Sequence, residues 1–492
     1  MKRLILGIIL IAACLTQLSF GDDVIPVWTR TYNPGSNQFD TGYGIAVDNS
    51  GNVYVTGYDC FTGIWTRKYD SNGSQVWTKT YQGTVAYGVS KGFGIAVDSS
   101  GNVYVTGCDD VVGQGLNIWT RKYDRNGNEV WTKAHNGSAN SEDIGYGIAV
   151  DNSGNVYVTG HETVTGQGAN IWTRKYDSNG NEVWTKTYND TANGNDKGYG
   201  IAVDNSGNVY VTGYEKVTGQ SANIWTRKYD SSGNEVWTKT YNDAANGEDV
   251  GWGIAVDNSG NVYVTGYETV TSQRMWTRKY DSNGNEVWTK TYNGTLSANG
   301  KGVAVDSSGN VYVMGFEYVR EFCSNIMARK YDNNGNEVWT KTHNGSANST
   351  DIGNGIAVDS SGNVYVTGRE IETDSVYNIW TRKYAPQTTT TLTDTGYFKI
   401  IGGKDGYINP NAGEVANFLY KTTEAGTTVF KVYNLKNELV RTVSVAASGP
   451  AQIDSFNFDC KNEDGNYLSS GIYIIKAEGS GLALVKKLAI IK

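Results

Sequence analysis

The sequence predicts an all-β protein, with a seven-bladed β-propeller followed by a small β-sandwich. Three observations predict this fold class. A segment recurs seven times, no proline lies between Pro34 and Pro386, and all 14 tryptophans lie between Trp28 and Trp380. Because proline cannot donate to a strand ladder, a long proline-free block favours one large sheet-rich unit. The recurrence indicates that this unit is an array of similar blades.

The repeated segment is clearest in the string GYGIAVDNSGNVYVTG at Gly42–Gly57. Its aspartate recurs at intervals of 50, 53, 53, 53, 49 and 53 residues. The seven positions are Asp48, Asp98, Asp151, Asp204, Asp257, Asp306 and Asp359. Repeats of this length are typical of propeller blades, each of which is a sheet of four strands.

Each copy contains four short segments with strand character, which we name A to D. Segments A and B, GIAVD and VYVTG, flank the turn Asn49–Asn52. Segments C and D, IWTRKYD and VWTKTY, flank the turn Ser71–Ser74. The small residues of strand A suit a crowded axis, and the Trp and Tyr of strands C and D suit a wide rim. The aspartate before the A–B turn is expected to cap backbone N–H groups rather than to hold a cation.

The two ends of the repeat block complement each other. The seventh copy stops after its strand C at Ile379–Tyr384, whereas Val27–Tyr32 matches a strand D without a preceding blade. Pairing these two segments would complete the last blade and leave no open sheet edge. We therefore predict a propeller over residues 27–384, closed by the N-terminal strand.

The repeat also carries a family resemblance. GIAVDNSGNVYVTG followed by IWTRKYD resembles the SBBP β-propeller repeat of secreted bacterial proteins, and is more distantly similar to NHL repeats. The resemblance implies the propeller fold and implies no single activity.

Composition changes after the repeats. A Thr-rich linker is expected at residues 385–395, and residues 396–492 contain no Trp and read as a β-sandwich of six or seven short strands. The expected strands are Val415–Lys421, Thr428–Tyr433, Leu439–Val445, Gln452–Phe458, Ile472–Ala477 and Leu482–Ile491.

Two resemblances concern this C-terminal domain. The run Phe458–Tyr473 resembles the end of the Ig-like domain of flagellar hook-capping (FlgD-type) proteins, although no Trp lies near Asp459. The ending Lys486–Lys492 resembles the sorting domains of type IX secretion substrates. Either resemblance implies export, attachment or assembly, with secretion machinery or the cell envelope as partner.

The N-terminus predicts export to the outside or to the cell surface. Residues 1–21 read as a signal peptide, with Lys2 and Arg3 before an apolar stretch and a cleavage site at Ser19–Gly21. The alternative is a lipobox at Ile11–Cys14, which would make Cys14 a lipid anchor. No later run reaches the ~18 apolar residues of a membrane-spanning helix.

Charge and cysteine content exclude some classes of protein. A net charge of -8 argues against a nucleic-acid partner, because phosphates require a basic surface. The four cysteines after the signal are too few for a disulfide scaffold. A bridge between Cys60 and Cys108, in neighbouring repeats, stays open beside the interpretation of incidental free thiols.

Catalytic signatures are missing from the sequence. It contains no HExxH, no zinc-type cysteine pairs and no Walker loop. The GxSxG string at Gly88–Gly92 falls in a loop between blades, without the strand–turn–helix context of a nucleophile elbow. We therefore predict a non-enzymatic protein without a cofactor, with Ca²⁺ left open. The alternative is an extracellular carbohydrate-active hydrolase or lyase that uses carboxylates such as Glu215 and Glu268.

The long D–A and B–C loops gather on one face of a propeller, where binding residues usually lie. Every blade has an acid two residues after the glycine that ends segment B: Asp59, Asp109, Glu162, Glu215, Glu268, Glu317 and Glu370. Five blades add an acid two residues before the GxG of strand A: Asp40, Asp143, Asp196, Asp249 and Asp351. These acids are predicted either to pair with strand-C arginines such as Arg67 or to cap loops, or else to form a negative funnel for cations, Ca²⁺ or basic partners.

The residue between the paired glycines of strand A is the second candidate. It is Tyr43, Phe93, Tyr146, Tyr199 and Trp252 in five blades, then Lys301 and Asn354. Blades 6 and 7 also have unusual loops at Glu317–Asn325 and Glu370–Asn378. One interpretation is loop drift. The other is an aromatic and polar mouth that binds a carbohydrate or a peptide. We favour an exported binding or adhesion scaffold whose ligand is a carbohydrate, a peptide or a cell-surface protein.

Overall fold

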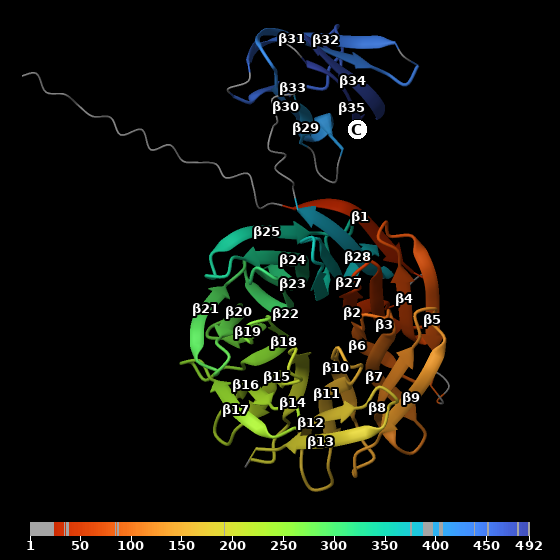
Figure 1. Cartoon of the computed structure of the whole chain (residues 1–492), viewed down its shortest axis with the longest axis vertical. Helices are drawn as coiled ribbons and strands as arrows, with labels where there is room; N and C mark the ends of the chain where they lie inside the picture. The colour runs from red at the N-terminus through yellow and green to blue at the C-terminus, as the bar shows by residue number, and fades with distance from the viewer. Residues whose placement is uncertain are drawn as a thin grey trace, which may run out of the picture. The chain divides into compact units, whose positions relative to one another are not determined.

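We describe a computed structural model of the chain (Figure 1), which divides after Pro386 into two compact units. The structure describes residues 24–386 except 34, 36–38, 84, 86–87, 191 and 374–375. It also describes residues 397–490 except 403–406, 437, 450–451 and 480–481. The expected signal peptide, the alternative anchor Cys14 and nearly all of the expected linker lie outside these residues. No helix in this part of the chain is long and apolar enough to cross a membrane.

The first unit consists of seven antiparallel four-stranded sheets, so the predicted fold class is confirmed. The first strands of neighbouring blades contact one another around a closed circle at the centre of the ring (Figure 1). The first three blades are β2 (Thr41–Val47), β3 (Val53–Asp59), β4 (Gly63–Tyr69) and β5 (Gln75–Tyr81); β6 (Lys91–Val97), β7 (Val103–Val111), β8 (Gly115–Tyr123) and β9 (Glu129–His135); and β10 (Ile144–Val150), β11 (Val156–Thr163), β12 (Ala169–Tyr176) and β13 (Glu182–Tyr188).

The remaining blades repeat this order. They are β14 (Lys197–Val203), β15 (Val209–Lys216), β16 (Ala222–Tyr229) and β17 (Glu235–Tyr241); β18 (Val250–Val256), β19 (Val262–Thr269), β20 (Gln273–Tyr280) and β21 (Glu286–Tyr292); β22 (Ser297–Val305), β23 (Val311–Arg320), β24 (Cys323–Tyr331) and β25 (Glu337–His343); and β26 (Ile352–Val358), β27 (Val364–Thr373), β28 (Val376–Pro386) and β1 (Val24–Tyr32).

The N-terminal strand forms the outer edge of the seventh blade. β1 pairs antiparallel with β28, with Thr29 opposite Arg382 and Tyr32 opposite Ile379. The ring therefore closes through contacts between the two ends of the repeat block, and the seam has the same four strands as every other blade.

Aromatic side chains fill the gaps between blades. Trp65 of β4 is fully buried in one cluster with Val53 of its own blade and Tyr365 of blade 7, and six blades bury the equivalent Trp. Met327 takes this position in blade 6 and is also fully buried. The strand-D tryptophans lie further out, where Trp77 packs at 6.4 Å from Tyr123. Most of the aromatic content therefore packs the scaffold.

The A–B turns use the aspartate in the predicted way. Asp48 Oδ1 accepts the N–H groups of Ser50 and Asn52, each at 2.9 Å, and its Oδ2 accepts the Tyr54 hydroxyl at 2.8 Å. Gly51 has φ +75°, which glycine adopts without strain. The other six blades repeat this network, so these carboxylates are fully engaged by their own turns.

The second unit is a sandwich of two sheets around a phenylalanine core. Phe398, Phe418, Phe430 and Phe458 are buried there, with Phe418 and Phe430 at 5.5 Å. One sheet is β29 (Tyr397–Ile401), β30 (Ala416–Lys421) and β33 (Asp454–Phe458); the other is β32 (Leu439–Ser448), β31 (Ala425–Tyr433), β34 (Gly471–Gly479) and β35 (Leu482–Ile490), and a short 3-10 turn spans Pro410–Ala412.

Candidate functional site

The residue between the paired glycines of strand A lies at a β-bulge in every blade. In blade 1 the register with β3 shifts between Gly42 and Gly44, so Tyr43 has no partner in the ladder. A bulge redirects the side chain at the bulged position. Glycine is required on both sides, because a Cβ on Gly42 would lie 2.5 Å from Thr367 Oγ1 and one on Gly44 2.8 Å from the Phe93 carbonyl.

We call the seven bulge residues the collar, and all seven are half-buried. The five aromatic residues form a continuous row, in which each ring contacts that of the neighbouring blade. The ring centroids are separated by 4.9 Å for Tyr43–Phe93, 5.2 Å for Phe93–Tyr146, 4.8 Å for Tyr146–Tyr199 and 3.9 Å for Tyr199–Trp252. The structure thus brings together the aromatic residues that the repeat pattern singled out.

The collar changes character in blades 6 and 7. Lys301 places its Nζ 3.3 Å from the centroid of the Trp252 ring, a cation–π contact. Burial lowers the pKa of Lys301 to about 7. Asn354 donates to the Gly42 carbonyl at 2.9 Å and so joins blade 7 to blade 1. Five aromatic residues, one amine and one amide therefore complete the collar.

The seven strand-B acids do not form an open negative funnel. Each accepts a hydrogen bond from the last residue of strand D in the preceding blade, and Asp59 and Glu268 are fully buried. The pairs are Tyr32–Asp59 (3.1 Å), Tyr81–Asp109 (2.9 Å), His135–Glu162 (2.7 Å), Tyr188–Glu215, Tyr241–Glu268 (2.5 Å), Tyr292–Glu317 (2.8 Å) and His343–Glu370 (2.8 Å). The acids act as bridges between blades, because each must replace its lost hydration with a hydrogen bond.

In blades 2 to 5 the recurring strand-C arginine pairs with an acid of strand D and not with the strand-B acid, whereas Arg274, an additional arginine of β20, does pair with Glu268 at 2.6 Å. Arg121 forms an ion pair with Glu129 of strand D in its own blade at 3.3 Å, and its Nε donates to Thr132 at 2.7 Å. The same arrangement recurs in blades 3 to 5. Because the guanidinium lies over the outer strands, it does not reach the acid at the loop end of strand B.

The loop acids are buried between the D–A and B–C loops. Asp196 accepts the N–H groups of Asp190 and Lys216, each at 2.8 Å. Asp249 accepts those of Asp243 at 2.7 Å and Thr269 at 3.0 Å. Burial raises the pKa of both carboxyl groups to about 6. These acids hold the two loops together, which is the capping interpretation of the sequence.

Cys60 and Cys108 form no disulfide. Both are free thiols, and Cys108 is buried inside β7 opposite Lys91. Cys60 follows β3, so it lies two repeat positions later than Cys108. The two thiols therefore do not occupy equivalent places in neighbouring blades, and the bridge left open by the sequence is ruled out here.

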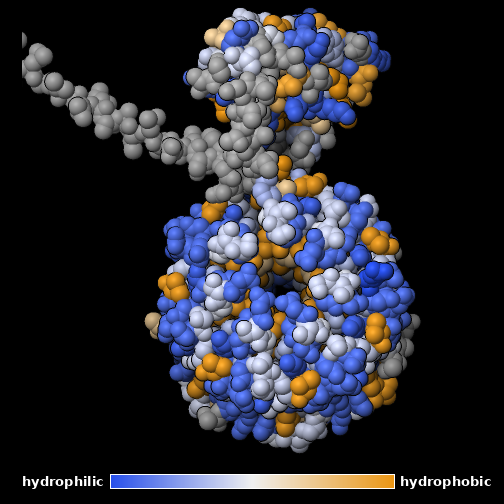
Figure 2. All heavy atoms as spheres, viewed as in Figure 1, coloured by the Kyte–Doolittle hydropathy of each residue, from blue (hydrophilic) through white to orange (hydrophobic). Residues whose placement is uncertain are grey.

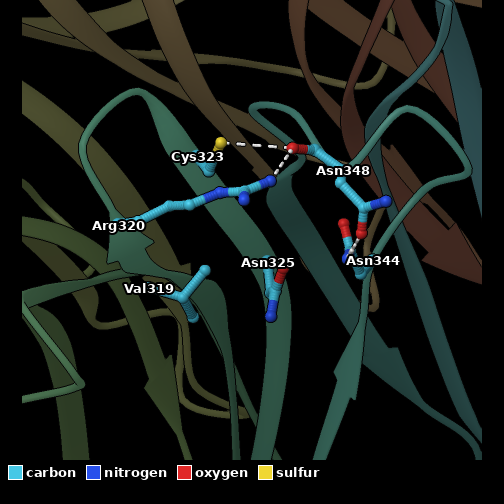
Figure 3. Close-up of a pocket in the computed structure, with 6 residues that line it drawn as sticks. All are labelled: Val319, Arg320, Cys323, Asn325, Asn344 and Asn348. Carbon is cyan, nitrogen blue, oxygen red and sulfur yellow. Dashed lines mark hydrogen bonds between the residues drawn. The ribbon is translucent and has the colours of Figure 1, made fainter.

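The loop face carries a pocket that the sequence did not specify. It lies between blades 6 and 7, has a volume of about 390 Å³ and is lined by Val319, Arg320, Cys323, Asn325, Asn344 and Asn348. Arg320 and Cys323 both donate to the carbonyl of Asn348, at 2.9 and 3.1 Å (Figure 3). The unusual sequence of the loop Glu317–Asn325, which departs from the other blades, was the signal for this place. None of the described residues that line the pocket is a carboxylate, and Glu215 and Glu268 are not among them.

Exposed apolar side chains occupy several loop tips on the same face. Phe322 is 79% exposed at the tip of the β23–β24 hairpin and has φ +61°, an uncommon conformation for a bulky residue. Val112 is 77% exposed and Phe61 51% exposed in the equivalent loops of blades 2 and 1. Figure 2 shows the ring as a largely hydrophilic disc with a central hollow. Against that background the exposed loop tips are candidates for contact with another molecule.

Comparisons with known proteins identify the parts of the chain. The model of the SBBP beta-propeller repeat matches residues 27–58, 79–107, 137–161, 183–214, 236–267, 287–315 and 344–369, one segment for each blade. The FlgD Ig-like domain matches residues 411–481. A search of curated proteins finds no match.

Two solved structures share a low similarity with the chain. One is PorZ, a bacterial surface component of the type-IX secretion system of Porphyromonas gingivalis, with 13% identity and a TM-score of 0.41. The match covers 94% of this chain and 60% of the PorZ chain. The other is a structural-genomics target assigned as a gluconolactonase, with 10% identity and a TM-score of 0.35, over 74% of this chain and 94% of that one. Neither similarity carries an activity or a partner over to this chain. With all seven blades matched by the repeat model, the chain is an SBBP-repeat β-propeller protein with a C-terminal FlgD Ig-like domain.

Proposed function

We propose that the protein is an exported, non-enzymatic binding scaffold whose ligand, a carbohydrate or a peptide, binds at the collar. The observation that carries this proposal is the interruption of five aromatic residues by Lys301 and Asn354. Aromatic faces stack on sugar rings and on apolar side chains, and an amine and an amide add hydrogen bonds that orient a ligand. The C-terminal domain would serve export or surface attachment.

Among the described residues, the carboxylates of the repeat support binding over catalysis, because their hydrogen bonds leave them unsuited to act on a substrate. The acids that a hydrolase or lyase would use are engaged: Glu215 by the hydroxyl of Tyr188, and Glu268 by Tyr241 and by Arg274 at 2.6 Å. A general acid or base must be free to reach its substrate. We therefore prefer binding to catalysis for the loop face.

The test compares glycan and peptide arrays for the wild-type protein and three variants. Tyr199→Ala combined with Trp252→Ala removes the stacked pair of the collar. Trp184→Ala removes an aromatic residue of the outer rim, where Trp184 packs at 6.2 Å from Tyr157, and controls for a general loss of packing. Lys301→Tyr restores the residue type of the first five blades.

We expect the wild-type protein and Trp184→Ala to bind the same ligands. The double variant and Lys301→Tyr should lose that binding. Unchanged binding by the double variant would refute the collar as the site, and the absence of any ligand on either array would refute the proposal as a whole.

A further inference from the structure

The loop acids share a hydrogen-bond pattern in four blades, and blade 1 lacks part of it. In blades 3, 4, 5 and 7 the acid accepts two backbone N–H groups, one from the B–C loop and one from the residue six positions before the acid. The second donors are Gly137 to Asp143 at 2.5 Å, Asp190 to Asp196 at 2.8 Å, Asp243 to Asp249 at 2.7 Å and Gly345 to Asp351 at 2.5 Å. Both carboxylate oxygens are therefore satisfied in these four blades.

In blade 1 the second donor does not exist. The residue six positions before Asp40 is Pro34, which has no amide hydrogen. Asp40 Oδ1 still accepts the Cys60 N–H at 3.1 Å. Its Oδ2, however, has no hydrogen-bond partner among the described residues, although Asp40 is fully buried. A buried carboxylate oxygen without a partner is costly, so a missing ligand is indicated.

Two further ligand groups lie beside this carboxylate. Asp40, Asp59 and Cys60 each offer a ligand atom, and these atoms lie within 4.8 Å of one another. Asp59 is held in place by the Tyr32 hydroxyl at 3.1 Å and by the N–H of Phe61 at 2.9 Å. The position of Cys60 is Asp110, Thr163, Lys216, Thr269, Tyr318 and Ile371 in the other blades. Blade 1 thus gains a thiol where it loses a backbone donor.

We propose that Asp40, Asp59 and Cys60 bind one divalent transition-metal ion of the zinc type. A thiolate with two carboxylates matches the ligands that Zn²⁺ accepts, whereas Ca²⁺ takes oxygen ligands alone. The ion would take the place of the backbone N–H that Pro34 lacks as the second partner of Asp40, and would join the D–A and B–C loops of blade 1. This site is independent of the collar and of the ligand proposed there.

The test titrates Co²⁺ into the metal-stripped, full-length protein and follows the thiolate-to-cobalt charge-transfer absorption. We expect one Co²⁺ per chain, displaced by Zn²⁺ and not by Ca²⁺. Cys60→Ser should abolish the absorption and weaken Zn²⁺ binding by at least about tenfold, and Asp40→Asn should weaken it to a similar extent. Cys323→Ser, which removes a half-buried thiol of blade 6, is the matched control and should bind as the wild type does.

A second measurement on the wild-type protein needs no variant to fold. Zn²⁺ should slow alkylation of Cys60 by at least about tenfold and leave Cys323 unchanged, as measured by peptide mass spectrometry. Equal alkylation rates with and without Zn²⁺, or a cobalt absorption that survives Cys60→Ser, would overturn the proposal.

Discussion

Replacing Lys301 by methionine removes the one cationic residue of the collar while keeping a long, unbranched side chain. In the folded protein burial lowers the pKa of Lys301 to about 7 from 10.5. Below pH 7 the amine is charged in both the folded and the unfolded chain, so the folded state bears the full cost of the buried charge. Between pH 7 and 10.5 only the unfolded chain keeps the proton, and the wild-type protein gains stability as the pH rises.

The size of the effect follows from two opposing contributions. The change in pKa corresponds to about 5 kcal/mol, at about 1.36 kcal/mol for each tenfold change in acidity. The contact of the ammonium with Trp252 at 3.3 Å favours the charged amine by about 2 kcal/mol, as a desolvated cation–π pair does, and so raises the folded-state pKa above the value that burial alone gives. We therefore expect Lys301→Met to be about 3 kcal/mol more stable than the wild type at pH 6.

The assay is equilibrium urea unfolding followed by tryptophan fluorescence. It reports on the propeller alone, because all 14 tryptophans lie between Trp28 and Trp380. The difference between variant and wild type should shrink steadily from pH 7 and vanish near pH 10.5. A variant that is less stable at pH 6, or a difference that does not depend on pH, would refute the reasoning that burial makes Lys301 a stability cost.

Three further predictions use the same assay. Tyr241→Phe should cost about 1–3 kcal/mol, because it removes a hydrogen bond from the fully buried Glu268; a change below about 0.5 kcal/mol would contradict a bridging role. Asp196→Asn should lower the free energy of unfolding by about 1–3 kcal/mol, because an amide –NH₂ would face a backbone N–H. Asp40→Asn in metal-free protein should change it by less than about 0.5 kcal/mol, because Asp40 lacks the second backbone donor. Equal costs for the two variants would contradict this difference between blade 4 and blade 1. Acidification from pH 7 to about 4 should not destabilise the propeller on balance, because Asp40, Asp196 and Asp249, each with a pKa raised to about 6, gain protons in the folded state and outweigh the buried His161, whose lowered pKa of about 3 acts in the opposite direction. Hydrogen bonds lower the pKa of turn acids such as Asp204, despite their partial burial, so protonation of these acids should cause unfolding only below about pH 4. Steady destabilisation from pH 7 downwards would contradict this balance.

The fold was predictable because the sequence pattern of each blade strand recurs in seven copies. Strand lengths, the A–B turn at Asp48 and the wide-rim tryptophans all follow from local patterns that agree with one another. The bulge at Tyr43 did not follow from the pattern, because it depends on the register between two strands. The flanking pair of glycines was its only trace in the sequence.

The sequence predicted the positions of the strand-B acids correctly but not their hydrogen-bond partners. The sequence placed one in each blade, but its donor lies in the preceding blade, as with His135 and Glu162. The signal was present: every strand D ends in a Tyr or a His, and every blade has the matching acid. Seven recurrences of two complementary residues indicate a bridge, by the same argument that assigned Asp48 to its turn.

Internal symmetry therefore separates scaffold from function in this chain. A polar residue that recurs in all seven blades is satisfied by its repeat, as Glu268 is by Tyr241. A polar residue outside this pattern must find another partner, as Asn354 does in the Gly42 carbonyl, or burial imposes a cost on the fold. Lys301 departs from the repeat in its own identity, whereas Asp40 keeps the acid of the repeat but lacks the second backbone donor, because Pro34 stands at that position. Because proteins keep such costs mainly where they serve a function, the two departures point to a ligand in the collar and to an ion in blade 1.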